Sequence, residues 1–167
     1  MTTVQIVSGN IAEVPADALI TTHNSFGFGP GYIDLAITNV AADMFHPLVP
    51  HNLRDGKACV VRATGAHAGA FKHVLFVGDD WKKPLLEIVL AALKQAERVG
   101  LHSVSLPILR TGAAQKMTGD SKEKNMQAMV AGINQFRASK PSHLQTITLV
   151  TYKDSSGERY FKQALGL

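Results

Sequence analysis

Along this chain, short runs of consecutive hydrophobic residues alternate with longer segments in which hydrophobic residues recur every three or four positions. The second pattern is clearest over residues 84–99, where it predicts a helix with one buried face. Pro84 suits the first turn of this helix, and Gly100 marks its end. Similar spacing predicts further helices over residues 31–45, 120–136 and 158–165.

The short hydrophobic runs predict β-strands, because they are rich in Val, Ile, Leu and Thr and are bounded by turn-forming residues. The connection over residues 46–56 contains two prolines, so we expect it to lack regular structure. The predicted strands cover residues 4–7, 17–22, 57–62, 72–77, 103–109 and 145–152.

Strands that alternate with helices predict the α/β class, with a mainly parallel sheet and helices on both of its faces. A length of 167 residues suits one domain, and we expect a single domain over residues 1–167 because no repeat or linker interrupts the pattern. In such sheets ligands bind beyond the carboxyl ends of the strands. The polar segments expected there are Asn10, residues 23–24, 27–31 and 109–112, and Tyr152.

One of these segments carries a specific chemical signal. Gly27, Gly29 and Gly31 follow a predicted strand and lead directly into a predicted helix. Glycines let backbone N–H groups approach an anion without interference from a Cβ atom, and a helix N-terminus adds about half a positive charge. The arrangement therefore predicts a binding site for a phosphorylated ligand.

The composition is that of a soluble globular protein, with 46% hydrophobic and 18% charged residues. The net charge of +4 favours anionic ligands, but Lys and Arg are interleaved with acidic residues, so a nucleic-acid partner is not expected. A single cysteine excludes an internal disulfide framework and favours a reducing compartment. No window approaches the ~18 apolar residues of a membrane span. We expect a cytoplasmic protein that acts as a monomer.

The histidines show no metal-site spacing, so we expect neither a metal nor a cofactor. Ser25 lacks the context of a catalytic serine. His23 could act as a general base by residue type, but a packed or solvent-facing histidine is the simpler interpretation.

Five short segments stand in order along the chain: Gly9-Asn10-Ile11, residues 17–24 (DALITTHN), residues 29–37 (GPGYIDLAI), residues 107–112 (PILRTG) and Tyr152-Lys153-Asp154. Together they resemble the signatures of the macro domain family, α/β/α modules that bind ADP-ribose. The resemblance covers essentially the whole chain.

The resemblance implies a three-layer α/β/α fold with a mixed, mainly parallel central sheet. It also implies that two glycine-containing phosphate loops bind ADP-ribose, an ADP-ribose derivative or ADP-ribosylated protein. If the protein is an enzyme, the resemblance implies an ADP-ribosyl hydrolase or O-acetyl-ADP-ribose deacetylase, in which Asn24 and Asp34 position the distal ribose and a water. The ligand-binding residues implied are Asn10, Ile11, Gly29, Gly31, Tyr32, Ile33, Arg110, Thr111, Gly112, Ala113 and Tyr152.

Several positions depart from the family pattern. Asn10 replaces an aspartate that binds the adenine amino group, and Thr21 replaces an asparagine. Tyr32 replaces the last glycine of the first loop, where its ring would cover or obstruct the distal ribose. Arg110 replaces a small residue of the second loop, and its guanidinium is expected either to bind the diphosphate or to point to solvent. Ala113-Ala114 stands where the family has an aromatic residue.

Three residues have local explanations that compete with a ligand role. Asn24 could stabilise a turn at the end of its strand. Asp34 could interact with the dipole of the following helix, an effect of roughly 0.3–1 kcal/mol. Tyr152 could cover the core rather than stack on an adenine ring.

Three functions remain as hypotheses: an ADP-ribose binding module, an enzyme that acts on ADP-ribosyl adducts, and a binder of RNA or poly(ADP-ribose). Asn24 and Asp34, ten residues apart as in hydrolytic macro domains, favour the enzyme. Thr21, Tyr32 and the altered second loop favour a binder. The third hypothesis lacks aromatic residues within a basic patch. We expect an ADP-ribose-binding macro domain, with hydrolysis as an open alternative.

Overall fold

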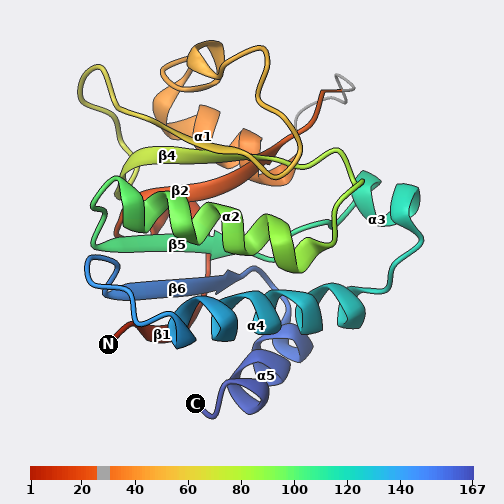
Figure 1. Ribbon diagram of the computed structural model, residues 1–167. Helices are drawn as coiled ribbons and strands as arrows, with labels where there is room; N and C mark the ends of the chain where they lie inside the picture. The colour runs from red at the N-terminus through yellow and green to blue at the C-terminus, as the bar shows by residue number, and fades with distance from the viewer. Residues whose placement is uncertain (26–30) are drawn as a thin grey trace.

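The computed structural model describes residues 1–25 and 31–167, and in this part of the chain a six-stranded sheet lies between two layers of helices (Figure 1). The strand order is β1-β6-β5-β2-β4-β3. Each neighbouring pair is parallel except β3 and β4, so the sheet is mixed and mainly parallel, as predicted. The strands are β1 (Thr3–Ser8), β2 (Ala16–His23), β3 (Ala58–Val61), β4 (Phe71–Gly78), β5 (Ser103–Pro107) and β6 (Thr146–Thr151).

The helices are α1 (Tyr32–Ala41), α2 (Leu85–Arg98), α3 (Ala113–Thr118), α4 (Lys122–Ala138) and α5 (Ser155–Ala164), with the short 3₁₀ helices η1 (Ile11–Glu13) and η2 (His46–Leu48). Helices α2 and α4 cover one face of the sheet and α1 the other (Figure 1). Helix α1 ends at Ala41 rather than at residue 45, because Ala42 has a positive φ of 46° that stops the helix. The sequence did not predict η1, η2 or α3, which are too short for a periodic pattern.

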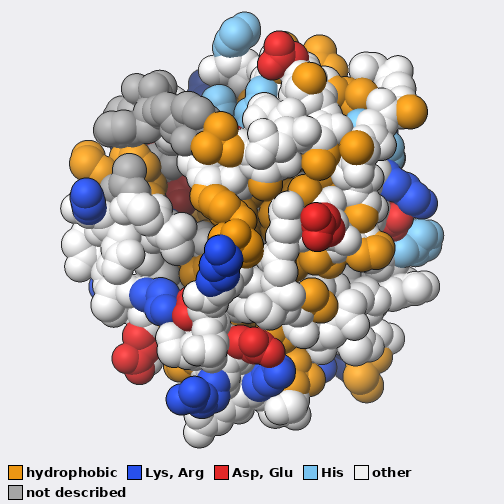
Figure 2. Space-filling view, turned by 180° about the vertical axis from the view of Figure 1, so that it is seen from behind, with side chains coloured by type: hydrophobic (Ala, Val, Ile, Leu, Met, Phe, Trp, Pro, Cys, Tyr) orange, Lys and Arg blue, Asp and Glu red, His pale blue; other side chains and the backbone are white. Residues whose placement is uncertain are grey.

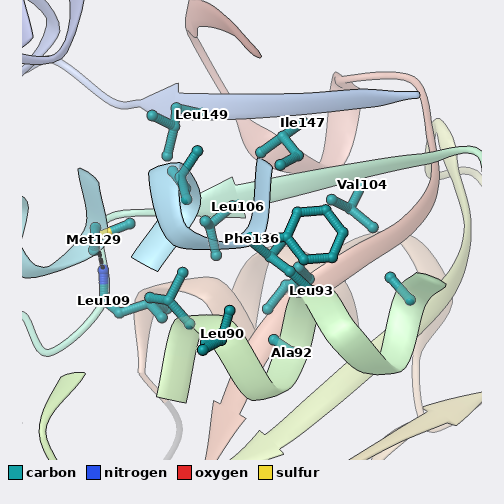
Figure 3. Packing of buried hydrophobic residues seen from close by; sticks show 14 of the residues in the cluster. Leu90, Ala92, Leu93, Val104, Leu106, Leu109, Met129, Phe136, Ile147 and Leu149 are labelled. Atoms are coloured by element: carbon teal, nitrogen blue, oxygen red, sulfur yellow. Dashed lines mark hydrogen bonds between the residues drawn. The ribbon is translucent and has the colours of Figure 1, made fainter. Parts of the chain in front are cut away.

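The core consists of two hydrophobic clusters, one on each face of the sheet. Successive residues of a strand point to opposite faces, so Ala18 and Ile20 join the cluster of α2 and α4, whereas Leu19 joins that of α1. Figure 3 shows the first cluster, in which side chains from α2, α4, β5 and β6 interlock. The predicted apolar stripe of α2 is buried there. Leu109 follows β5 and is tied to this cluster, since its N–H donates to the Met129 sulfur at 3.4 Å. The core therefore holds the segment after β5 in place.

On the face that carries α1, the charged side chains of the described residues do not gather into one dominant patch (Figure 2). Figure 2 shows this face, with Lys and Arg separated by acidic side chains. Within the described residues, no helix combines the length and the apolar character that crossing a membrane requires.

Glu97, near the end of α2, joins that helix to the connection before β6. Its carboxylate accepts N–H groups of Ser142, His143 and Leu144 at 2.7 to 3.0 Å. Burial alone would raise the pKa of Glu97, but these backbone donors outweigh it and lower the pKa from 4.5 to about 2. The ionised carboxylate therefore stabilises the folded state.

We expect the Glu97→Gln variant to lose about 1–3 kcal/mol of unfolding free energy at pH 7, since hydrogen bonds to a charged acceptor are lost. Because the folded pKa lies below the unfolded one, this contribution is complete above pH 4.5 and is lost as the pH falls to about 2. Urea unfolding of parent and variant between pH 7 and pH 2 measures it, with Glu13→Gln on the surface as the control. A constant difference between parent and variant across this range would contradict the assignment.

Candidate functional site

A cavity of about 380 Å³ opens at the carboxyl-terminal edge of the parallel strands. Its walls come from the end of β2, the first turn of α1, the loop after β4, the segment after β5 and the end of β6. This is the edge where ligands bind in open α/β sheets. The predicted site residues that line the cavity are Asn24, Gly31, Tyr32, Ile33, Asp34, Arg110, Thr111, Gly112 and Tyr152.

The carboxylate of Asp34, in the first turn of α1, is bound from three directions. The Gly31 N–H lies 3.4 Å from Oδ2, and the Thr21 hydroxyl lies 3.4 Å from Oδ1. His46 Nε2, on η2, lies 3.1 Å from Oδ1. With a side chain that is 26% exposed, Asp34 remains accessible from the cavity. The carboxylate is therefore held in one orientation at the cavity wall.

Arg110 forms a buried ion pair beneath the cavity. Its Nε and Nη2 donate to the two carboxylate oxygens of Asp79 at 3.0 Å, and Nη2 also donates to the Lys83 carbonyl. The side chains of Arg110 and Asp79 are only 5% and 2% exposed. The alternative that this guanidinium points to solvent is therefore wrong. Its contacts join the segment after β5 to the loop after β4.

The backbone of the segment after β5 turns sharply, with positive φ angles of 56° at Arg110 and 63° at Gly112. A non-glycine residue is rarely found in this region, so the buried ion pair helps to hold Arg110 there. Asn125 of α4 adds a further constraint, since its Nδ2 donates to the Arg110 carbonyl at 3.0 Å. Gly112 tolerates the turn because it has no Cβ atom.

Tyr32 and Tyr152 stack on each other at the cavity. Their ring centroids are 5.0 Å apart and their planes differ by 28°. The two residues are 49% and 45% exposed, so Tyr152 lies at the surface instead of in the core. Burial first, and then the neighbouring Tyr152, raises the pKa of the Tyr32 phenol above its ordinary value. The two rings therefore offer planar aromatic surfaces next to the cavity.

Comparison of the sequence with known proteins finds distant relatives of similar length. No protein-family model matches the chain. It is 24% identical over 180 residues to an uncharacterized protein of Pyrococcus furiosus, covering 95% of this chain and 96% of that one. It is 23% identical over 176 residues to an uncharacterized protein of Thermococcus kodakarensis, covering 93% and 95% of the two chains.

Among solved structures, the Oceanobacillus iheyensis macrodomain with ADP superimposes with a TM-score of 0.77 at 18% identity, covering 99% of this chain and 90% of that one. The chain has the macrodomain fold. The Trypanosoma brucei macrodomain in complex with ADP-ribose gives a TM-score of 0.76 at 17% identity, covering 98% and 69% of the two chains. The macrodomain of Mycobacterium tuberculosis DarG gives 0.64 at 18% identity, covering 89% and 98%.

Two predicted site residues, Asn10 and Ile11, are not among the described residues that line the cavity of this macrodomain fold. Asn10 caps η1, where its Oδ1 accepts the Ala12 N–H at 3.0 Å. Ile11 is 2% exposed and packs in the α1 cluster. Ala113 is the first residue of α3, and Gly29 lies outside the described residues.

The carboxylates of the cavity wall are Asp34, Asp79 and Asp154. Asp154 caps α5 through the Gly157 N–H at 2.9 Å and pairs with Lys122 Nζ at 2.9 Å. Burial alone would raise the pKa of Asp154, but these two donors lower it below its ordinary value. Each of the three carboxylates thus has its own donors in the macrodomain fold. Among the described residues, no cluster of three His, Cys, Asp or Glu side chains could hold a metal ion.

The sequence analysis did not identify two residues that shape the site. His46 follows Asp34 by twelve positions and lies in a segment predicted to be irregular. Asp79 lies in a run where acidic residues and lysines are interleaved, yet its side chain is buried against Arg110. Neither contact has a local signal, because both join segments that only the macrodomain fold brings together.

Proposed function

We propose that the cavity binds ADP-ribose, free or attached to a protein. The observation that carries the proposal is that one cavity brings together the N-terminal turn of α1, the Arg110–Gly112 segment and an exposed tyrosine. Its volume of about 380 Å³ lies within the range typical of small-molecule sites, roughly 300–1,000 Å³. Solved macrodomains of the same fold with ADP or ADP-ribose support this choice of ligand.

Each part of the ligand has a counterpart in the wall. Backbone N–H groups at Gly31 and in the 110–112 segment bind the pyrophosphate, and the positive end of α1 adds to its stabilisation. The ring of Tyr152 stacks on the base. Asn24 and Asp34 bind hydroxyl groups of the distal ribose, as polar groups with fixed geometry provide specificity in apolar pockets.

Isothermal titration calorimetry tests the proposal. We expect ADP-ribose to bind in a 1:1 ratio and more tightly than ADP, because ADP lacks the distal ribose that Asn24 and Asp34 would contact. Ribose 5-phosphate, which lacks the adenosine and one phosphate, serves as the weakly bound control. No saturable heat with millimolar ADP-ribose would rule out this function.

A second candidate function is the release of ADP-ribose from carboxylate-linked adducts, favoured because Asn24 and Asp34 line the same cavity. Here a water attacks the anomeric carbon of the distal ribose, the bond to the carboxylate oxygen breaks, and the free carboxylate leaves. The two side chains would contribute mainly by orienting ribose and water.

An ADP-ribosylated protein labelled on acidic residues tests the release. We expect the parent to remove the label within hours and Asp34→Ala to leave it in place. Asp43→Ala, an exposed aspartate after α1, is the matched control. If the parent releases nothing, the protein is a binding module only.

A further inference from the structure

His46 contacts the cavity only through another residue. It lies on η2, between Phe45, which is fully buried, and Pro47, so the backbone at this point is anchored in the core. His46 is not among the residues that line the cavity, but its Nε2 lies 3.1 Å from Oδ1 of Asp34, which does line it. Any effect of His46 on a bound ligand must therefore act through this carboxylate.

The imidazole ring is itself held from the sheet side. Phe76 of β4 packs edge-on against it, with ring centroids 5.3 Å apart and planes at 76°. Thr21, which is paired with Phe76 between β2 and β4, directs its hydroxyl to the same Asp34 Oδ1 at 3.4 Å. The sheet and η2 therefore both fix one oxygen of the carboxylate, whereas the other has, among the described residues, only a long contact with the Gly31 N–H.

The hydrogen bond also determines where the proton of His46 lies. A carboxylate only accepts hydrogen bonds, so Nε2 must carry the proton that it donates. Nδ1 is buried and has no hydrogen-bond partner among the described residues, so a proton at that atom would be an unsatisfied donor. Of the two neutral tautomers, the one with hydrogen on Nε2 therefore fits these contacts, and His46 acts as a donor to Asp34.

We propose that His46 is a positioning residue for the ligand site: it fixes Oδ1 of Asp34 and so leaves Oδ2 to accept a hydroxyl group of the distal ribose. The proposal rests on the proposed function, because it assigns His46 a part in binding ADP-ribose. An interaction of Asp34 with the dipole of α1 alone would not require contacts from Thr21 and His46. These two contacts therefore favour a ligand role for Asp34.

A double-mutant cycle measured by calorimetry with ADP-ribose tests this inference. We expect His46→Phe, which keeps a ring but removes the donor, to weaken binding about ten- to a hundredfold, the effect of one hydrogen bond to a charged group. In the Asp34→Ala background the same change should have no effect. His46→Gln retains an N–H donor and should restore affinity to within about twofold of the parent.

The controls separate positioning from a structural role. His51→Phe, exposed on the same connection, should bind like the parent, and the thermal midpoints of the His46 variants should show that they remain folded. Equal weakening by His46→Phe with and without Asp34, or failure of His46→Gln to restore binding in a folded protein, would overturn the role of His46. An unchanged affinity in Asp34→Ala would do the same. Absence of binding by the parent would instead overturn the proposed function.

Discussion

A Gly31→Glu variant should lose most of the affinity for ADP-ribose while keeping its fold. Gly31 precedes α1 and lines the cavity, and a Cβ atom added there meets no atom within 4 Å. Its φ of −77° suits any residue, and a carboxylate at a helix N-terminus is favourable, so no loss of stability is expected. The new charge would, however, lie close to the bound pyrophosphate.

The size of this effect follows from electrostatics. Two like charges about 5 Å apart at an effective dielectric constant of about 20 repel by about 3 kcal/mol, which corresponds to a loss of about a hundredfold in affinity. Gly31→Gln is the matched control, because it has the same shape without the charge and should keep a much larger share of the affinity. Calorimetry of the three proteins measures the difference. Equal affinity in the parent and the glutamate variant would show that the pyrophosphate does not bind at this part of the cavity.

Removing the guanidinium of Arg110 should have the largest effect on stability. In Arg110→Met, the carboxylate of Asp79 stays 2% exposed with no opposite charge, and an uncompensated buried charge typically costs 3–5 kcal/mol. The Lys83 carbonyl loses a donor as well. We therefore expect a loss of about 3–5 kcal/mol in the free energy of unfolding, measured by urea denaturation.

A second substitution shows whether the buried charge is the cause. Asp79→Asn in the Arg110→Met background removes the charge but can still accept the Trp81 N–H, so it should recover at least half of the loss. Lys124→Met is the comparison for an exposed pair, since Lys124 is 69% exposed where it meets Asp120, and should cost less than about 1 kcal/mol. A loss below 1 kcal/mol in Arg110→Met itself would contradict the assignment.

The order of strands and helices could be predicted because each element has a local signal. The stripe from Leu85 to Ala96 and the continuous apolar run of β4 reflect burial of one helix face and of both strand faces. The parallel sheet then brings the ends of β2, β5 and β6 to one edge, which is why Asn24, Arg110 and Tyr152 line one cavity.

The pairing of side chains within the cavity could not be predicted. Tyr32 was expected to cover or obstruct the distal ribose, and nothing in the sequence indicated that its ring stacks on Tyr152, 120 positions later in the chain. Arg110 was weighed between the ligand and solvent, whereas it binds Asp79. Such contacts depend on how closely the loops that follow different strands approach one another. The hydrophobic periodicity of the sequence contains no information about these distances.

The ion pair of Arg110 and Asp79 also affects how the loops at the cavity respond to ionic strength. Dissolved ions screen interactions between solvent-exposed charges, but they screen the buried pair of Arg110 and Asp79 much less. High salt concentrations should therefore weaken the surface ion pairs of Lys124 and Lys162. The buried ion pair should continue to join the two loops at the cavity. The arrangement of the two loops at the cavity should therefore depend little on the ionic strength around the protein.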